Sequence, residues 1–232
     1  MKHLVRHYQS RDRTFSFLRL CGAVVFATAF AAFAPGAPAA ADDVAVRSMT
    51  QNVDEGTDFQ HFPGATTPQA FAAAVTATYG DILATNPAER AVAIAGEIAR
   101  EAPDIVALQE ATTLRTGPTT PATTVQFDWL QSLTADLNRL GAPYAVVAVV
   151  PGIDVNLPST LGFDVRLTRQ DAILVRLSDS AKLANIQVER FGAQATIPTP
   201  FGPIPFYHGF ASVDVSLGGA TFRFATTHLL PV

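Results

Sequence analysis

Three polar side chains each follow an apolar, strand-like segment of the chain. Asn52 ends the first such segment, Glu110 follows residues 105–109, and His228 follows residues 222–227. Side chains at the carboxyl ends of neighbouring strands converge on one rim, where the sites of layered α/β proteins are built. A carboxylate, an amide and an imidazole on one rim could bind a hard cation and a phosphate group. The sequence therefore predicts a polar site that contains Asn52, Glu110 and His228.

The elements that must position these residues can be predicted from hydrophobic periodicity and from breaks at Gly and Pro. Residues 44–52 alternate as a strand does, and residues 88–100 place Ala91, Ile94, Ala95 and Ile98 on one helical face. The continuous apolar run 105–108 is typical of a strand buried on both faces. The chain thus begins with a strand, helix, strand order.

The later part adds helices and a largely antiparallel set of strands. Gly218-Gly219 between two alternating segments predicts a hairpin. The further expected elements are a helical excursion at 68–79, a helix at 125–140, strands at 144–150 and 172–177, a loop between 151 and 168, and hairpin strands at 210–217 and 221–227. This pattern predicts an α/β or α+β layered sandwich, with two mixed sheets flanked by helices.

The first 41 residues have the pattern of a secretory signal peptide. Five basic residues precede an almost uncharged stretch, residues 20–33, and three alanines stand before Asp42. The apolar core is shorter than the roughly 20 residues that a membrane-spanning helix needs. We expect residues 1–41 to be removed, residues 42–232 to form one domain, and the protein to be secreted, extracellular or periplasmic, without a transmembrane anchor.

Without the signal segment the chain is acidic. It keeps 11 of 16 Lys and Arg and 19 of 20 Asp and Glu, which gives a net charge of −8, and Lys182 is its only lysine. Non-specific nucleic-acid binding needs a basic surface, so we expect no stable nucleic-acid complex. A small phosphoester or a lipid head group suits the chain better than DNA as a substrate. Nucleic acid stays open, because a bound divalent cation would locally reverse the charge.

Cysteine and serine chemistry are disfavoured. Cys21 is the only cysteine and lies in the signal segment, so the mature chain is expected to have no disulfide and no thiolate ligand or nucleophile. The Gly-x-Ser-x-Gly turn of serine esterases does not occur in the sequence. Oligomeric state has no signature in the sequence.

Four segments resemble successive motifs of the endonuclease/exonuclease/phosphatase superfamily of metal-dependent phosphoester hydrolases. In chain order they are MTQNV at 49–53, PDIVALQE at 103–110, RQDAIL at 169–174 and FRFATTHL at 222–229. PDIVALQE is the most specific, whereas NV and THL occur in many proteins. The superfamily includes pancreatic-type deoxyribonucleases, apurinic-site endonucleases, secreted sphingomyelinases and inositol-polyphosphate phosphatases.

The resemblance implies roles for five residues. Glu110 would be a ligand of Mg²⁺ (or Mn²⁺), and Asn52 would help to hold the metal or the scissile phosphate. His228 would donate to a phosphate oxygen and assist proton transfer, which suits a side chain that changes charge near neutral pH. Arg169 and Asp171 would orient the site or form an ion pair. Each also has a plainer interpretation, as a surface, turn, buried or paired residue.

Two further histidines have less certain roles. His208 stands where secreted members of the superfamily more often carry arginine, and a neutral imidazole binds phosphate less firmly than a guanidinium group does. His61 could contact the rim from the segment after the first strand, although an exposed loop histidine is the default expectation. Substrate selection is expected in the long segments 54–88 and 151–168.

Two motifs that the resemblance calls for do not follow His228 in this sequence. They are a Gly-Asp-x-Asn segment that activates the attacking water and a terminal Ser-Asp-His segment that binds phosphate. We therefore expect an incomplete sandwich with its second sheet short of strands, and little or no hydrolase activity of the chain as given. The alternative is a secreted, non-catalytic binding module or pseudoenzyme of the same fold.

Overall fold

The computed structural model describes residues 45–118, 121–178, 181–193 and 195–229. The expected signal peptide, residues 1–41, lies outside the described residues. The chain divides into two units, Met1–Asp42 and Asp43–Val232, and the fold described below is that of the second unit. None of the helices in the described part of the chain is long and apolar enough to cross a membrane.

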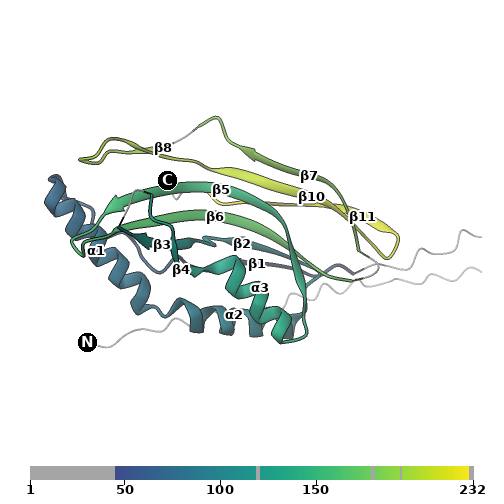
Figure 1. Ribbon diagram of the computed structural model, residues 1–232. Helices are drawn as coiled ribbons and strands as arrows, with labels where there is room; N and C mark the ends of the chain where they lie inside the picture. Colours follow the sequence, from purple (N-terminus) through teal and green to yellow (C-terminus); the bar gives the residue numbers. More distant parts are fainter. Residues whose placement is uncertain (1–44, 119–120, 179–180, 194, 230–232) are drawn as a thin grey trace, which may run out of the picture. The chain divides into compact units, whose positions relative to one another are not determined.

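Three helices and eleven strands make up the described unit (Figure 1). The helices are α1 (Pro68–Ala84), α2 (Pro87–Glu101) and α3 (Trp129–Arg139). The strands are β1 (Ser48–Asn52), β2 (Ile105–Gln109), β3 (Thr113–Gly117), β4 (Thr124–Asp128), β5 (Tyr144–Pro158), β6 (Asp164–Arg176), β7 (Lys182–Arg190), β8 (Ala195–Ile197), β9 (Ile204–Phe206), β10 (Gly209–Leu217) and β11 (Ala220–Thr227).

The largest sheet is mixed and is organised around the long hairpin of β5 and β6. β1 pairs in parallel with β2, and β2 pairs antiparallel with one end of β6. The other end of β6 pairs with β3, which continues to β4, while β5 runs along the opposite edge of β6. A second, antiparallel sheet has the order β11-β10-β7, and β8 and β9 form a separate hairpin.

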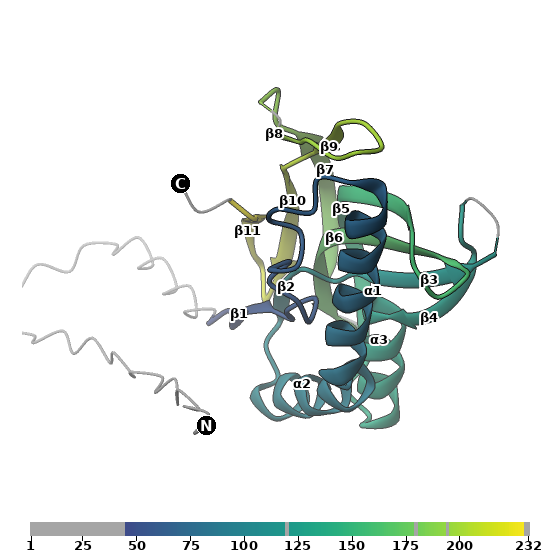
Figure 2. The same ribbon diagram turned by 90° about the vertical axis from the view of Figure 1, so that its left-hand side faces the viewer.

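The elements stack as layers, with α2 and α3 on one face of the large sheet and the small sheet on the other (Figures 1 and 2). α1 packs against Leu114, Val165 and Leu167. α2 and α3 pack on the first face through a cluster that includes Ile98, Trp129 and Leu133. The second face contacts the small sheet, where Ile173 meets Val213 and its neighbours. The protein is therefore an α+β layered sandwich, as the sequence predicted.

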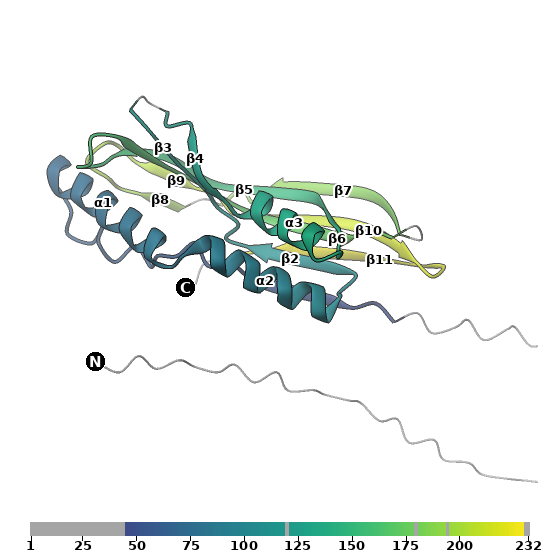
Figure 3. The ribbon, with the colours of Figure 1, turned by 60° about the horizontal axis from the view of Figure 1, so that its bottom comes forward.

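Local sequence explains where the helices begin. Thr67 accepts a hydrogen bond from the Ala70 N–H at the start of α1, and Asp128 accepts one from Gln131 at the start of α3. α2 follows α1 almost directly (Figure 3), because Pro87 occupies its first turn, where the missing N–H costs little. α2 thereby reaches back along the sheet to deliver the chain to β2.

Two expectations from the sequence are wrong. The segment before α3 is not helical from residue 125, because residues 113–117 and 124–128 pair as β3 and β4. The segment 151–168 is not a loop, because β5 continues to Pro158 and β6 begins at Asp164. The Pro and Gly at 151 and 152 mark a bulge in β5, where the register with β6 shifts, and not its end.

Candidate functional site

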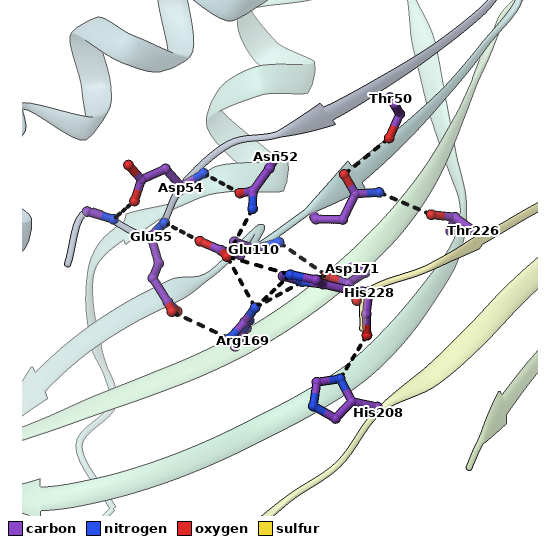
Figure 4. A network of polar contacts seen from close by, with 12 residues as sticks. Thr50, Asn52, Asp54, Glu55, Glu110, Arg169, Asp171, His208, Thr226 and His228 are labelled. Atoms are coloured by element: carbon purple, nitrogen blue, oxygen red, sulfur yellow. Dashed lines mark hydrogen bonds and ion pairs between the residues drawn. The ribbon is translucent and has the colours of Figure 1, made fainter. Parts of the chain in front are cut away.

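The structure brings all five predicted site residues together (Figure 4). Parallel pairing of β1 with β2 places Asn52 beside Gln109, so the following residue, Glu110, leaves β2 at the rim where β1 ends. Glu110 has a φ of 62°, a left-handed conformation that costs a non-glycine residue energy and often occurs at functional sites. This turn directs the chain away from the sheet immediately after the strand.

Three groups donate to the two carboxylate oxygens of Glu110. The Asn52 amide nitrogen lies 3.0 Å from Oε1, and the backbone N–H of Glu55 lies 3.1 Å from Oε2. Arg169 Nη2 lies 3.2 Å from Oε1. These three donors fix the orientation of the carboxylate.

Arg169 and Asp171 come from the middle of β6, where β3 and β2 diverge. Residues two apart on a strand share a face, so both side chains point towards the side of the sheet that carries β11. Arg169 Nη2 lies 2.9 Å from His228 Nδ1, and Asp171 Oδ1 accepts from the Glu110 backbone N–H at 3.1 Å. Both residues of this pair therefore contact other predicted site residues.

His228 faces both a cation and two carboxylates. Arg169 Nη2 lies 2.9 Å from Nδ1 and 3.4 Å from Nε2. A guanidinium group can only donate, so the shorter contact assigns Nδ1 as the acceptor and places the proton of a neutral imidazole on Nε2. Nε2 is 3.8 Å from Glu110 Oε1, while Nδ1 is 3.6 Å from Asp171 Oδ1. The ring is therefore positioned to donate from Nε2 into the rim.

Glu55 is a site residue that the sequence reasoning did not identify. Its side chain is only 3% exposed, its Oε1 lies 3.6 Å from Arg169 Nη1, and its Oε2 has no hydrogen-bond partner among the described residues. Burial raises its pKa to about 8, Arg169 opposes that shift, and the carboxylates of Glu110, Asp54 and Asp171 add to it. Glu55 is therefore a largely protonated acid at neutral pH.

The loop after β1 is built to bury Glu55. Asn52 Oδ1 accepts from the Asp54 N–H at 2.8 Å, and Asp54 Oδ1 accepts from the Gly56 N–H at 2.7 Å. Gly56 has a φ of 91° and packs so closely against Thr85 that a Cβ would clash. Arg90 of α2 donates to the carbonyls of Val53 and Asp54. The sequence signal that could have predicted this loop is the spacing of Asn52, Asp54 and Gly56, which allows two successive Asx turns that end in a glycine.

A buried polar contact connects the two sheets next to the site. Gln109 Nε2 donates to Thr226 Oγ1 at 3.1 Å, and Gln109 Oε1 accepts from Thr50 Oγ1 at 3.3 Å. Thr226 precedes His228 by two residues, so this contact fixes the end of β11 against β2 (Figure 4). The position of His228 therefore depends on a hydrogen bond between the sheets.

His208 and His61 lie in different surroundings. His208 Nδ1 contacts the His228 backbone carbonyl at 2.8 Å, so His208 helps to hold the backbone of His228 in place. Its Nε2 is buried without a hydrogen-bond partner among the described residues. His61 is half-buried and pairs with Asp81 of α1 at 2.7 Å. The default expectation of an exposed His61 is wrong, because the side chain is partly buried against its carboxylate partner on α1.

The described residues contain no cluster of three His, Cys, Asp or Glu side chains that could form a preformed metal centre. Mg²⁺ often takes only one or two carboxylates, however, and completes its octahedron with water and substrate phosphate. Glu55 experiences three neighbouring carboxylates and one opposing guanidinium group. These three carboxylates, of Glu110, Asp54 and Asp171, outnumber the one guanidinium group, and this excess of negative charge fits a hard cation next to Glu110.

Comparisons with known proteins give limited similarity. No family model matches the chain. No curated protein matches it either. Among solved structures, the chain is similar to an endonuclease/exonuclease/phosphatase family protein from Leptotrichia buccalis C-1013-b, with a TM-score of 0.43 and 16% sequence identity. The match covers 61% of this chain and 47% of that chain, so this chain corresponds to about half of its length.

Proposed function

We propose that the rim formed by Asn52, Glu110, Arg169, Asp171 and His228 is the site of a secreted, Mg²⁺- or Mn²⁺-dependent phosphoester hydrolase of the endonuclease/exonuclease/phosphatase type. One observation carries the proposal. Side chains from the ends of β1, β2 and β11 and from the middle of β6 are joined by hydrogen bonds into one network. Their chemistry is that of a hard-cation and phosphate site.

Glu110 would hold the metal ion. Asn52 would hold the scissile phosphate or, with its amide group turned over, the metal ion, because its nitrogen faces Glu110 Oε1 and its oxygen accepts from the Asp54 N–H. When bound, Mg²⁺ would supply Lewis-acid polarisation of a phosphoryl oxygen. The Asp171 carboxylate accepts a hydrogen bond from the Glu110 backbone N–H, and the Asn52 amide donates one to the Glu110 carboxylate. The chain thereby fixes the direction in which Glu110 presents its oxygens before any ligand arrives, which reduces the reorganisation needed at binding.

Arg169 and His228 would bind the phosphoryl oxygens. The Arg169 side chain is only 12% exposed, so the charge of its rigid guanidinium group is weakly screened by water. The Nε2 proton of His228 is available to a substrate oxygen, and the same imidazole can pass a proton to a leaving oxygen. Donors aimed at developing negative charge contribute strongly in a site of low water content.

Hydrolysis of bis(4-nitrophenyl) phosphate with and without Mg²⁺ tests this function. We expect slow, Mg²⁺-dependent turnover that falls at least about 100-fold in Glu110→Gln and in His228→Ala. Glu97→Gln, on an exposed face of α2, and His61→Ala are the matched controls and should retain the rate. Turnover that is unchanged in Glu110→Gln, or that needs no divalent cation, would contradict the proposal.

A second candidate is phosphate binding without turnover, and one observation favours it. Arg169 already donates to both Glu110 and His228, so the site has a built-in cation that satisfies the carboxylate without a metal. In that case inorganic phosphate binds equally well with EDTA present, and no hydrolysis accompanies binding. Phosphate binding that requires Mg²⁺ would exclude this candidate.

A further inference from the structure

A large apolar cavity lies directly beside the polar rim. Its volume is about 870 Å³, within the range of roughly 300 to 1,000 Å³ typical of ligand sites. β5 and β6 line it through Ile153, Val155, Leu157 and Leu167, all on the face that the small sheet covers elsewhere. The cavity therefore occupies the layer next to the large sheet at the end that the small sheet does not reach.

The remaining walls come from two segments outside both sheets. The excursion after β1 contributes Phe59, Phe62 and residues 63–66, together with Phe71 of α1. The β8–β9 hairpin contributes Ile197, Pro198, Pro200, Ile204 and Phe206. Ring contacts of 5.0 Å between Phe62 and Phe71, and of 5.7 Å between Phe71 and Phe201 of the hairpin loop, hold these walls together.

Two charged residues of the rim also line the cavity. Glu55 and Arg169 are the only ionisable side chains of its described lining. The Arg169 guanidinium carbon lies 5.4 Å above the ring of Phe206, a cation–π arrangement that joins the apolar wall to the polar site. The unpartnered Glu55 Oε2 provides a further polar group at the same end. A ligand that fills the cavity would therefore place one end at the rim.

We infer that this cavity binds the hydrophobic part of the substrate, and that the substrate is a phosphoester of an alkyl or aryl alcohol whose phosphate lies against Arg169. This inference rests on the proposed function for the rim, but concerns a different set of residues. A ligand with only a phosphate would leave the apolar cavity filled with water, and one with only a hydrocarbon would place apolar atoms against the charged Arg169 side chain and the unpartnered Glu55 Oε2. An amphiphile with an anionic head satisfies both surfaces at once.

Binding of three phosphates by isothermal titration calorimetry tests the inference in the presence of Mg²⁺. The probes are inorganic phosphate, butyl phosphate and decyl phosphate, each below the concentration at which it forms micelles. Burial of each methylene tightens binding roughly fourfold at most, so decyl phosphate should bind at least about tenfold more tightly than butyl phosphate. Equal affinity for the two esters would overturn the inference.

Variants of the cavity wall show whether this preference arises there. Ala65→Trp fills the cavity and Ile197→Gln makes its wall polar, and both should remove most of the preference for decyl phosphate while leaving inorganic phosphate binding unchanged. Ile186→Gln is the matched control, because Ile186 is about as exposed as Ile197 but lies on β7 outside the cavity lining. A preference that persists in both wall variants, or that is lost equally in Ile186→Gln, contradicts the assignment.

The outcomes separate this inference from the proposed function. Chain-length preference without any hydrolysis supports the cavity assignment and contradicts the hydrolase proposal. Metal-dependent hydrolysis without chain-length preference supports the hydrolase proposal and contradicts the cavity assignment. Co-sedimentation with vesicles that contain phosphatidic acid then identifies the source of the ligand. Retention on vesicles that is lost in Ile197→Gln indicates a membrane lipid, and no retention, with decyl phosphate still preferred, indicates a free ester.

Discussion

Arg169 Nη2 lies 3.2 Å from Glu110 Oε1, so a guanidinium group from the middle of β6 neutralises the carboxylate at the end of β2. The same nitrogen contacts His228 Nδ1 at 2.9 Å, and Nη1 lies 3.6 Å from Glu55. One guanidinium group therefore contacts two acidic side chains and an imidazole from separate elements. Its removal would affect all three groups at once.

Replacement of Arg169 should destabilise the fold as well as weaken phosphate binding. Arg169→Ala leaves the Glu110 carboxylate in a poorly hydrated environment without its cation, and breaking a buried pair on one side costs about 3–5 kcal/mol. Arg139→Ala is the control, because its pair with Asp136 is exposed and should contribute less than about 1 kcal/mol. Urea unfolding measures both, and equal losses would refute a structural role of the Arg169 network.

Glu55 should make stability fall as pH rises through neutrality. Its pKa is about 8 in the folded state, against 4.5 for the same carboxyl group in an unfolded chain, so the native state binds more protons between these values. The free energy of unfolding that the protonated acid contributes therefore falls from about pH 5 upwards, and the fall ends above the folded pKa. The total loss is about 1.4 kcal/mol for each unit by which the two pKa values differ. In Glu55→Gln this loss should be absent.

Urea unfolding from about pH 6 to about pH 9, with EDTA present, compares the two proteins over the window where Glu55 titrates. The wild-type protein should lose stability relative to Glu55→Gln across this range. Parallel profiles for the two proteins would show that Glu55 ionises at an ordinary pH and that its burial is relieved in solution.

Gly209 should be intolerant of any side chain. A Cβ at this first residue of β10 would lie well inside contact distance of the Glu189 carbonyl on β7, so Gly209→Ala should destabilise the protein by about 1–3 kcal/mol. Gly96→Ala is the matched control, because Gly96 lies in α2 with open space around it and alanine favours a helix by about 0.5–1 kcal/mol. Thermal unfolding should shift in opposite directions for the two variants.

Loss of the contact between the sheets should disturb His228 from a distance. Thr226→Val removes the acceptor of Gln109 Nε2 and leaves a buried donor unsatisfied, at a cost of about 1–3 kcal/mol. Thr221→Val at the exposed end of β11 should change stability by less than about 0.5 kcal/mol. The His228 imidazole resonances in an NMR spectrum should shift in Thr226→Val alone, and an unchanged His228 would separate its position from this hydrogen bond.

Much of the first half of the fold could be predicted from local signals. The apolar run before Gln109 is fully buried as β2, and α2 begins at Pro87 and ends next to its predicted boundary. The double-glycine hairpin of β10 and β11 is also confirmed. These elements have strong periodicity or unambiguous breaks, so local sequence and tertiary packing favour the same structure.

The errors occurred where strand pairing overrides local propensity. Phe127 pairs with Leu114 in a hairpin, and Asp128 is the cap from which α3 begins, yet the sequence of residues 125–140 has a helical pattern throughout. Gly152 interrupts the alternating pattern of β5, and the sequence therefore suggested a loop. In the structure it lies in a bulge, where the absence of a side chain lets the backbone approach that of Arg169 closely. Glu55 resembles any loop carboxylate, because only the fold determines that it is buried.

The most direct test of the rim as a metal site is the effect of Mn²⁺ on the NMR signals of His228. Mn²⁺ is paramagnetic and takes oxygen ligands as Mg²⁺ does, so an ion held by Glu110 should broaden the imidazole resonances of His228 at substoichiometric concentration. Glu110→Gln should abolish the broadening, Glu97→Gln should preserve it, and excess Mg²⁺ should reverse it. Unbroadened His228 signals in the wild-type protein, or the same broadening in Glu110→Gln, would contradict a metal site at this rim.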